Sequence, residues 1–128
     1  NILATAKIIK EKFGGKVPRT MEEMLTLRGV ARKTANVFLG NAYGVVEGIA
    51  VDTHVRRLSQ RLGLSQNDDP VKIERDLMQL VPKKDWFKFT YLLIDHGRAI
   101  CMAKDPRCDL CPLNNICPSA FKFPRFGK

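Results

Sequence analysis

The sequence lacks several features that would assign it to common protein classes. It has no apolar run long enough to cross a bilayer and no basic amphipathic segment that would anchor it to a membrane surface. It shows no internal repeat, no low-complexity tract and no convincing alternation of apolar and polar residues. These absences exclude a membrane partner, a repeat array and a mainly β fold. No signal peptide is recognisable either, so we expect a cytoplasmic, intracellular protein.

Cysteine is scarce and confined to one stretch of the chain. The four cysteines are Cys101, Cys108, Cys111 and Cys117, with the spacing C-x6-C-x2-C-x5-C. Clustered cysteines in an intracellular protein bind metal more often than they form disulfides. Structural zinc sites commonly carry two C-x2-C pairs, and this sequence has one. One close pair with two outlying cysteines therefore favours a [4Fe–4S] cluster, with zinc as the first alternative and a disulfide pair as the second.

A basic charge is the main feature of the composition. The 128 residues include 22 Lys and Arg against 13 Asp and Glu, a formal net charge of +9. Such a charge attracts phosphate backbones and favours a nucleic-acid partner. Lys104 and Arg107 lie on the loop between the first two cysteines, and a metal that fixes both ends of this loop would hold them ready to bind phosphate. An ordinary solvated loop is the alternative.

Apolar residues recur at intervals of three and four through most of the chain, which predicts an all-α fold. Glycine pairs, prolines and N-capping residues divide this pattern into separate helices. The main predicted boundaries are a stop at Gly14–Gly15, a capping box at Thr20 and Glu23, a helix from about Arg32 to Ala42, N-caps at Asp52, Asp69 and Asp85, and a stop at Pro82.

The stretch LRGVARKTA, residues 27–35, joins a short helix to a longer one through a glycine-containing turn. The backbone N–H groups of such a hairpin, with the positive end of the second helix dipole, form an anion site. A DNA phosphate fits this site without any reading of base sequence. A helix–turn–helix corner with a packing role alone is the alternative. The residues predicted to contact DNA here are Arg28, Gly29, Val30, Ala31 and Arg32.

Four stretches together resemble the endonuclease III family of DNA glycosylases: residues 27–35, VDTH at 51–54, HGR at 96–98, and the four cysteines. The resemblance extends from Asn1 to about Ser119. It implies a helix–hairpin–helix glycosylase fold with two helical lobes. Lobe 1–46 would hold the hairpin at about 21–42, and lobe 47–128 would hold the iron–sulfur loop at 101–117. It also implies that the N-terminal lobe is incomplete, so that a further segment or self-association completes the barrel.

The resemblance also implies a function in base-excision DNA repair. The chain would be a bifunctional glycosylase with AP lyase (β-elimination) activity on oxidised pyrimidines, nucleoid-associated and acting on double-stranded DNA that contains damaged bases or abasic sites. Lys33 falls at the family's catalytic lysine, which attacks the sugar C1′ and forms a Schiff base. Asp52 falls at the catalytic aspartate, which stabilises positive charge on the sugar. The alternative is a non-catalytic DNA-binding iron–sulfur module, or an inactive fragment of such an enzyme.

Each of these residues also has a plainer interpretation. Lys33 could contact a phosphate beside Arg32, and Asp52 could serve only as an N-cap. The two histidines, His54 and His96, are predicted to be structural or hydrogen-bonding residues. The family commonly has Pro-Gly-Val-Gly where this chain has residues 28–31 as RGVA. Ala31 supplies the same backbone N–H, but a positive φ at that position would be costly.

Overall fold

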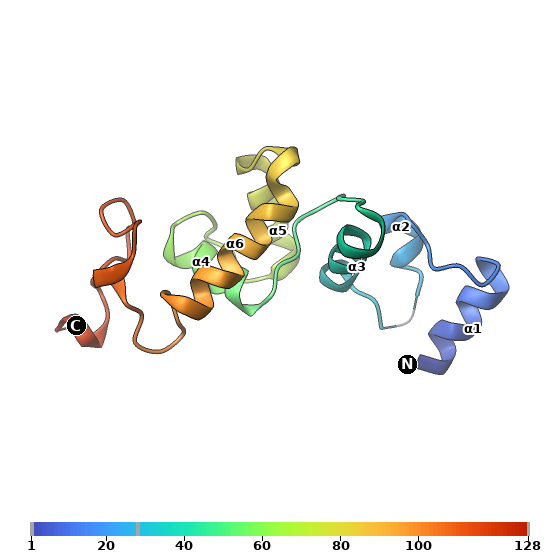
Figure 1. Ribbon diagram of the computed structural model, residues 1–128, viewed down its shortest axis with the longest axis horizontal. Coiled ribbons are helices and arrows are strands. Elements are labelled where there is room, and N and C mark those ends of the chain that lie inside the picture. The colour runs from blue at the N-terminus through green and yellow to red at the C-terminus, as the bar shows by residue number, and fades with distance from the viewer. Residues whose placement is uncertain (1, 28, 128) are drawn as a thin grey trace. The chain divides into compact units, whose positions relative to one another are not determined.

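The computed structural model describes residues 2–27 and 29–127 (Figure 1). Arg28, one of the residues predicted to contact DNA, lies outside the described residues. The described part contains α-helices and short π- and 3₁₀-helical turns and no strand, which confirms the all-α prediction. None of these helices is both long and apolar enough to span a membrane. The chain forms two compact units, Asn1–Ala50 and Val51–Lys128, whereas the resemblance implied a division after residue 46.

Each unit has its own set of helices. The first unit contains α1 (Ile2–Lys12), α2 (Met21–Met24), α3 (Arg32–Phe38) and the π-helical turn η1 (Leu39–Tyr43). The second unit contains α4 (Thr53–Arg61), α5 (Pro70–Leu80), the 3₁₀ turn η2 (Lys83–Asp85), α6 (Trp86–Ala99), and the 3₁₀ turns η3 (Cys108–Leu110) and η4 (Pro124–Phe126).

The core of the first unit holds the hairpin between α2 and α3 in place. Its buried side chains are Met21, Met24, Leu27, Ala35 and Leu39. The Glu47 carboxylate accepts the Met21 N–H at 2.9 Å, which satisfies a donor at the start of α2 that has no partner inside the helix. As predicted, α1 ends before Gly14 and Gly15, which adopt φ values of 60° and 83°. The Gly15 N–H then bonds the Ile9 carbonyl at 3.1 Å, so the glycines close the helix end.

Two of the three predicted aspartate caps in the second unit are confirmed. Asp52 accepts the Val55 N–H at 2.8 Å at the start of α4, and Asp69 accepts the Lys72 N–H at 3.2 Å at the start of α5. The prediction for Asp85 is wrong, because its side chain makes no cap hydrogen bond. Asp85 has helical rather than extended backbone angles, since α6 is entered directly from the 3₁₀ turn η2.

Helices α4 and α6 cross closely at Gly97 (Figure 1). A Cβ atom on Gly97 would lie 2.9 Å from Arg57 Nη2, 3.2 Å from His54 Cδ2 and 3.3 Å from Leu58 Cδ1. Arg57 Nη2 also donates to the Gly97 carbonyl at 3.1 Å. Glycine therefore lets the backbone of α6 approach α4. It fits this position because it has no Cβ atom, and not because the backbone has a positive φ.

We predict that Gly97→Ala destabilises the protein by about 1–3 kcal/mol, because the added methyl group must displace the side chains of α4. The free energy of unfolding, measured in urea or guanidinium, tests this. Arg98→Ala, at the next and exposed position of α6, is the control and should change stability by less than about 0.5 kcal/mol. Equal stability of the two variants would contradict the close crossing.

Candidate metal centre and nucleic-acid interface

The four cysteines lie on a loop whose turns are fixed by backbone hydrogen bonds. Cys101 follows the last turn of α6 and donates its N–H to the His96 carbonyl at 2.9 Å. The Arg107 N–H closes the base of the loop on the Ile100 carbonyl at 2.8 Å. Short helical turns follow and position the remaining three cysteines. The Asn114 side chain donates to the Cys108 carbonyl at 3.0 Å. The C-x2-C pair and the outlying cysteines therefore lie on one folded segment.

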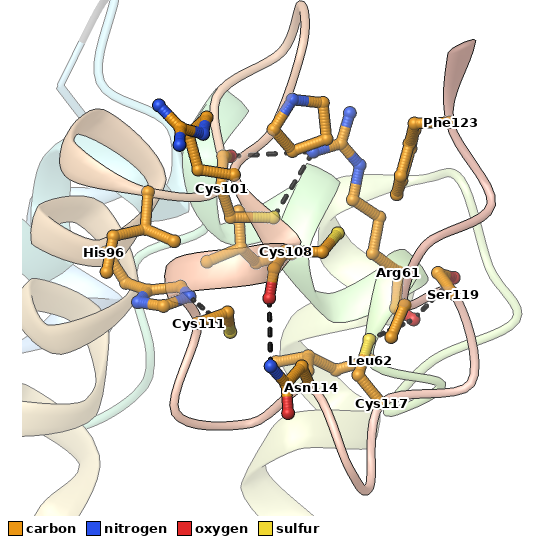
Figure 2. Close-up of a pocket in the computed structure, with 15 residues that line it drawn as sticks. Arg61, Leu62, His96, Cys101, Cys108, Cys111, Asn114, Cys117, Ser119 and Phe123 are labelled. Carbon is orange, nitrogen blue, oxygen red and sulfur yellow. Dashed lines mark hydrogen bonds between the residues drawn. The ribbon is translucent and has the colours of Figure 1, made fainter. Parts of the chain in front are cut away.

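All four cysteines line a single cavity, and none of them forms a disulfide (Figure 2). The apolar part of its lining includes Leu58, Leu62 and Ile100, contributed by α4 and the end of α6. Cys108 is buried and the other three are half-buried. The predicted ligands are thus brought together, in a setting that largely excludes water.

The arrangement fits a multi-atom cluster better than a single metal ion. Tetrahedral zinc holds its sulfur ligands about 2.3 Å from the metal, so the sulfurs lie about 3.8 Å apart. Among the described residues, no three His, Cys, Asp or Glu side chains are grouped closely enough to hold one ion. Four thiols round one cavity, with no fifth ligand needed, suit the corners of a [4Fe–4S] cube.

The electrostatics of the cavity also favour a metal cluster. Burial raises the pKa of the Cys111 thiol, and the neighbouring cysteines raise it further. Four thiolates this close repel one another in a poorly hydrated cavity, so a cationic cluster would stabilise their charged forms. Two N–H groups already face the sulfurs: the Leu113 N–H lies 3.4 Å from Cys111 Sγ, and Arg61 Nη1 lies 3.2 Å from Cys101 Sγ.

Two arginines of α4 contact the cysteine loop and escaped the sequence analysis. Arg57 donates to the Cys101 carbonyl at 3.0 Å, and Arg61 donates to the carbonyls of Met102 at 2.8 Å and Ala103 at 3.0 Å. The two arginines are four residues apart, so they project from the same face of the helix. That spacing was the available signal, but it does not by itself distinguish a loop contact from a solvated basic face.

Both histidines make hydrogen bonds, as predicted. His54 Nδ1 lies 3.1 Å from Asp52 Oδ2, so it orients the carboxylate whose other oxygen caps α4. His96 Nε2 lies 3.4 Å from Cys111 Sγ, and burial lowers the pKa of His96. Helix α6 thus contacts the cysteine loop through His96, while Asp52 keeps a fixed orientation at the start of α4.

The described residues of the hairpin differ in backbone conformation. Gly29 takes a positive φ of 79°, whereas Ala31 is extended with a φ of −102°. The departure from glycine at position 31 therefore costs no strain. Ala31 stands at the N-cap of α3, where its methyl side chain makes no cap hydrogen bond. Gly29 and Ala31 are exposed, and Val30 and Arg32 are half-buried.

Lys33 is exposed in the first turn of α3. It lines an open depression together with one face of α3 and η1, whose residues are Thr34, Val37, Phe38, Asn41 and Ala42. The aromatic rings of Phe38 and Tyr43 meet edge to face 5.6 Å apart, which stabilises this end of the helix. Lys33 belongs to the first unit and Asp52 to the second.

The two basic residues of the cysteine loop differ in their surroundings. Lys104 is exposed. Arg107 forms a two-pronged pair with Asp109, with Nε 3.0 Å from Oδ1 and Nη2 2.7 Å from Oδ2, and this contact lowers the pKa of Asp109. The charge of Arg107 is thus partly offset within the loop, while that of Lys104 faces solvent.

The chain matches known families over most of its length. Residues 1–83 match the family model described as HhH-GPD superfamily base excision DNA repair protein. Residues 101–117 match the model described as the iron–sulfur binding domain of endonuclease III. The cysteine loop is therefore an iron–sulfur site, and its four cysteines suit a [4Fe–4S] cluster.

Two of the similar proteins are named endonuclease III. Endonuclease III of Synechocystis is 57% identical over 120 residues, which cover 94% of this chain and 55% of that protein. Endonuclease III of Bacillus subtilis is 46% identical over 128 residues, covering 99% of this chain and 58% of that one. The chain thus spans a little over half the length of these relatives.

Two solved structures share the fold closely. A non-covalent endonuclease III–DNA complex gives a TM-score of 0.90 at 41% identity, covering 100% of this chain and 59% of that chain. A trapped covalent endonuclease III–DNA intermediate gives 0.88 at 41% identity, covering 94% of this chain and 57% of that chain.

We predict that anaerobically purified protein contains iron and acid-labile sulfide, with the visible absorbance of an iron–sulfur cluster. Replacing Cys108, the buried ligand, by serine should remove most of the iron. Elemental analysis with absorbance spectroscopy measures both. Asn115→Ala, at an exposed position of the same loop, leaves all four ligands in place and is the control. Stoichiometric zinc without visible absorbance would contradict the cluster.

Proposed function

Because this chain belongs to the HhH-GPD superfamily of base excision DNA repair proteins, and within it to the endonuclease III family, we propose that it is a DNA glycosylase with AP lyase activity. Its substrate would be double-stranded DNA that carries oxidised pyrimidines or abasic sites. The match of residues 1–83 carries the proposal, because this stretch includes both Lys33 and Asp52. The iron–sulfur loop supports it, because the second family match covers that loop as well.

Lys33 is proposed as the nucleophile. It is exposed in the first turn of α3, so its amine can reach a sugar without moving a packed side chain. Nζ would form a bond to the sugar C1′ while the bond from C1′ to the base breaks, and the base would leave with a proton. Loss of a proton from Nζ and opening of the sugar ring would give the Schiff base, and removal of a C2′ proton would then expel the 3′-phosphate by β-elimination.

Asp52 is proposed to stabilise the positive charge that develops on the sugar. Its carboxylate is held by two contacts, the Val55 N–H on one oxygen and His54 on the other. Its side chain is 18% exposed, so it keeps access to solvent while its orientation is fixed. A charged group held in this way needs little reorganisation when charge appears opposite it. Capping and catalysis are therefore compatible in one residue.

DNA would be held through its phosphates rather than through base edges. The hairpin would offer backbone N–H groups of its turn, where Gly29 is exposed, and the cysteine loop would offer the exposed Lys104. Such contacts carry no sequence information, which suits a repair protein that must act anywhere in a genome. Arg107 would contribute less directly, since Asp109 already engages its guanidinium.

We predict that borohydride traps a covalent adduct between the protein and abasic DNA, and that Lys33→Ala abolishes it, because Lys33 is the amine proposed to form the Schiff base. Gel electrophoresis of the trapped adduct measures this. Lys7→Ala, an exposed lysine on α1, is the matched control and should leave the adduct unchanged.

An adduct that persists in Lys33→Ala would remove Lys33 from its proposed role. Binding to abasic DNA without any adduct from the unaltered chain would instead favour the second candidate, a DNA-binding iron–sulfur module without catalysis.

We further predict that Lys104→Ala weakens binding to all DNA sequences alike and reduces the slope of log K against log salt concentration by about 0.9, the value for one lost phosphate contact. Fluorescence anisotropy at several salt concentrations measures the slope. The paired replacement Arg107→Ala with Asp109→Ala removes an ion pair without changing net charge, and should alter the slope less. An unchanged slope in Lys104→Ala would exclude Lys104 as a contact.

A further inference from the structure

Arg61 stands between the iron–sulfur site and the C-terminal tail (Figure 2). Its Nη1 lies 3.2 Å from Cys101 Sγ, within hydrogen-bond range of a sulfur acceptor. Its guanidinium lies over the Phe123 ring, 4.7 Å from the ring centroid. Its own carbonyl faces the other end of the loop, where it accepts the Ser119 hydroxyl at 2.7 Å. One residue of α4 thus contacts both ends of the cysteine segment and the tail.

The surroundings of Arg61 fix the direction of its N–H groups. The carbonyls of Met102 and Ala103 accept from Nη1 and Nη2 at 2.8 and 3.0 Å, and the face of Phe123 covers the guanidinium plane. Stacking on an aromatic ring and two carbonyl contacts leave a planar guanidinium few alternative orientations. The tail itself is tied to the cysteine loop by the ion pair between Arg125 and Asp105. The Nη1–H group that faces Cys101 Sγ is therefore held both by carbonyls of the cysteine loop and by the Phe123 ring.

A donor held against a ligand sulfur affects the cluster that the sulfur binds. A cluster gains negative charge when it is reduced, and both a hydrogen bond and a nearby positive charge stabilise that added charge. Arg61 supplies both at Cys101. Arg56, five residues earlier and on another face of α4, makes its ion pair with Asp68. The two arginines carry the same charge on the same helix, but only the contacts of Arg61 reach the cysteine loop in the part of the chain described.

We propose that Arg61 sets the reduction potential of the iron–sulfur cluster through its hydrogen bond to Cys101 Sγ, and that Phe123 holds it in that position. Arg61 is a positioning residue, since it acts through a cluster ligand and not on substrate. The inference requires the cluster at this site but not the glycosylase chemistry, so the failure of either proposal leaves the other standing.

The test is the midpoint potential of the cluster in the full, cluster-loaded chain, measured by a mediated titration that follows visible absorbance. Arg61→Gln should lower the potential, with at least a tenfold change in the one-electron reduction equilibrium, which corresponds to 59 mV. Phe123→Leu, which keeps the arginine but removes the ring beneath it, should shift the potential in the same direction by less. Arg61→Lys, which keeps the charge, should lie between Arg61→Gln and the unaltered protein.

Arg56→Gln is the matched control, because it removes the same charge from the same helix at a site paired with Asp68. A potential in Arg61→Gln equal to that in Arg56→Gln, at full iron content, would overturn the proposal. If Arg61→Gln does not retain iron, Phe123→Leu decides: a lowered potential supports the tuning role, and an unchanged potential overturns it.

Discussion

The close approach of α4 and α6 at Gly97 is the constraint on which the second unit depends. Because Gly97 has no side chain, Arg57 can reach across α6 to the carbonyls of Gly97 and Cys101. The same approach sets His54, and with it the Asp52 carboxylate, against α6. The first cysteine and the aspartate are thus positioned by one pair of helices, although they are far apart in the sequence. The iron–sulfur loop and the site of proposed chemistry share a common support.

The cysteine loop has two layers of support with different physical origins. Backbone hydrogen bonds shape its turns, so they survive most side-chain replacements. Arginines of α4 and the tail hold the outside of the loop through carbonyl contacts, an ion pair and an aromatic ring. Arg61 and Arg107 therefore line the metal site together with its apolar residues. This places positive groups next to both the cluster and the exposed Lys104, where phosphate would approach.

Much of the fold follows from local signals in the sequence. Gly14 and Gly15 end the first helix, and Asp52 and Asp69 cap the helices that follow them, because these effects need only neighbouring residues. The cap predicted at Asp85 failed because the 3₁₀ turn before α6 leads directly into the helix, with Asp85 already in helical backbone angles. Cysteine spacing predicted the metal site, but the contacts of Arg57 and Arg61 depend on which helix faces the loop. No local pattern specifies that choice.

Asp52 combines a role in folding and a proposed role in chemistry in one side chain. The oxygen that caps α4 and the charge proposed for catalysis belong to the same carboxyl group. Asparagine is as good an N-cap as aspartate, but it is neutral. The substitution Asp52→Asn would therefore abolish the proposed chemistry but leave the helix cap, the crossing of α4 and α6 and the cysteine loop intact. In evolution, a single conservative substitution would thus convert a protein with the proposed activity into a stably folded protein that binds DNA without acting on it.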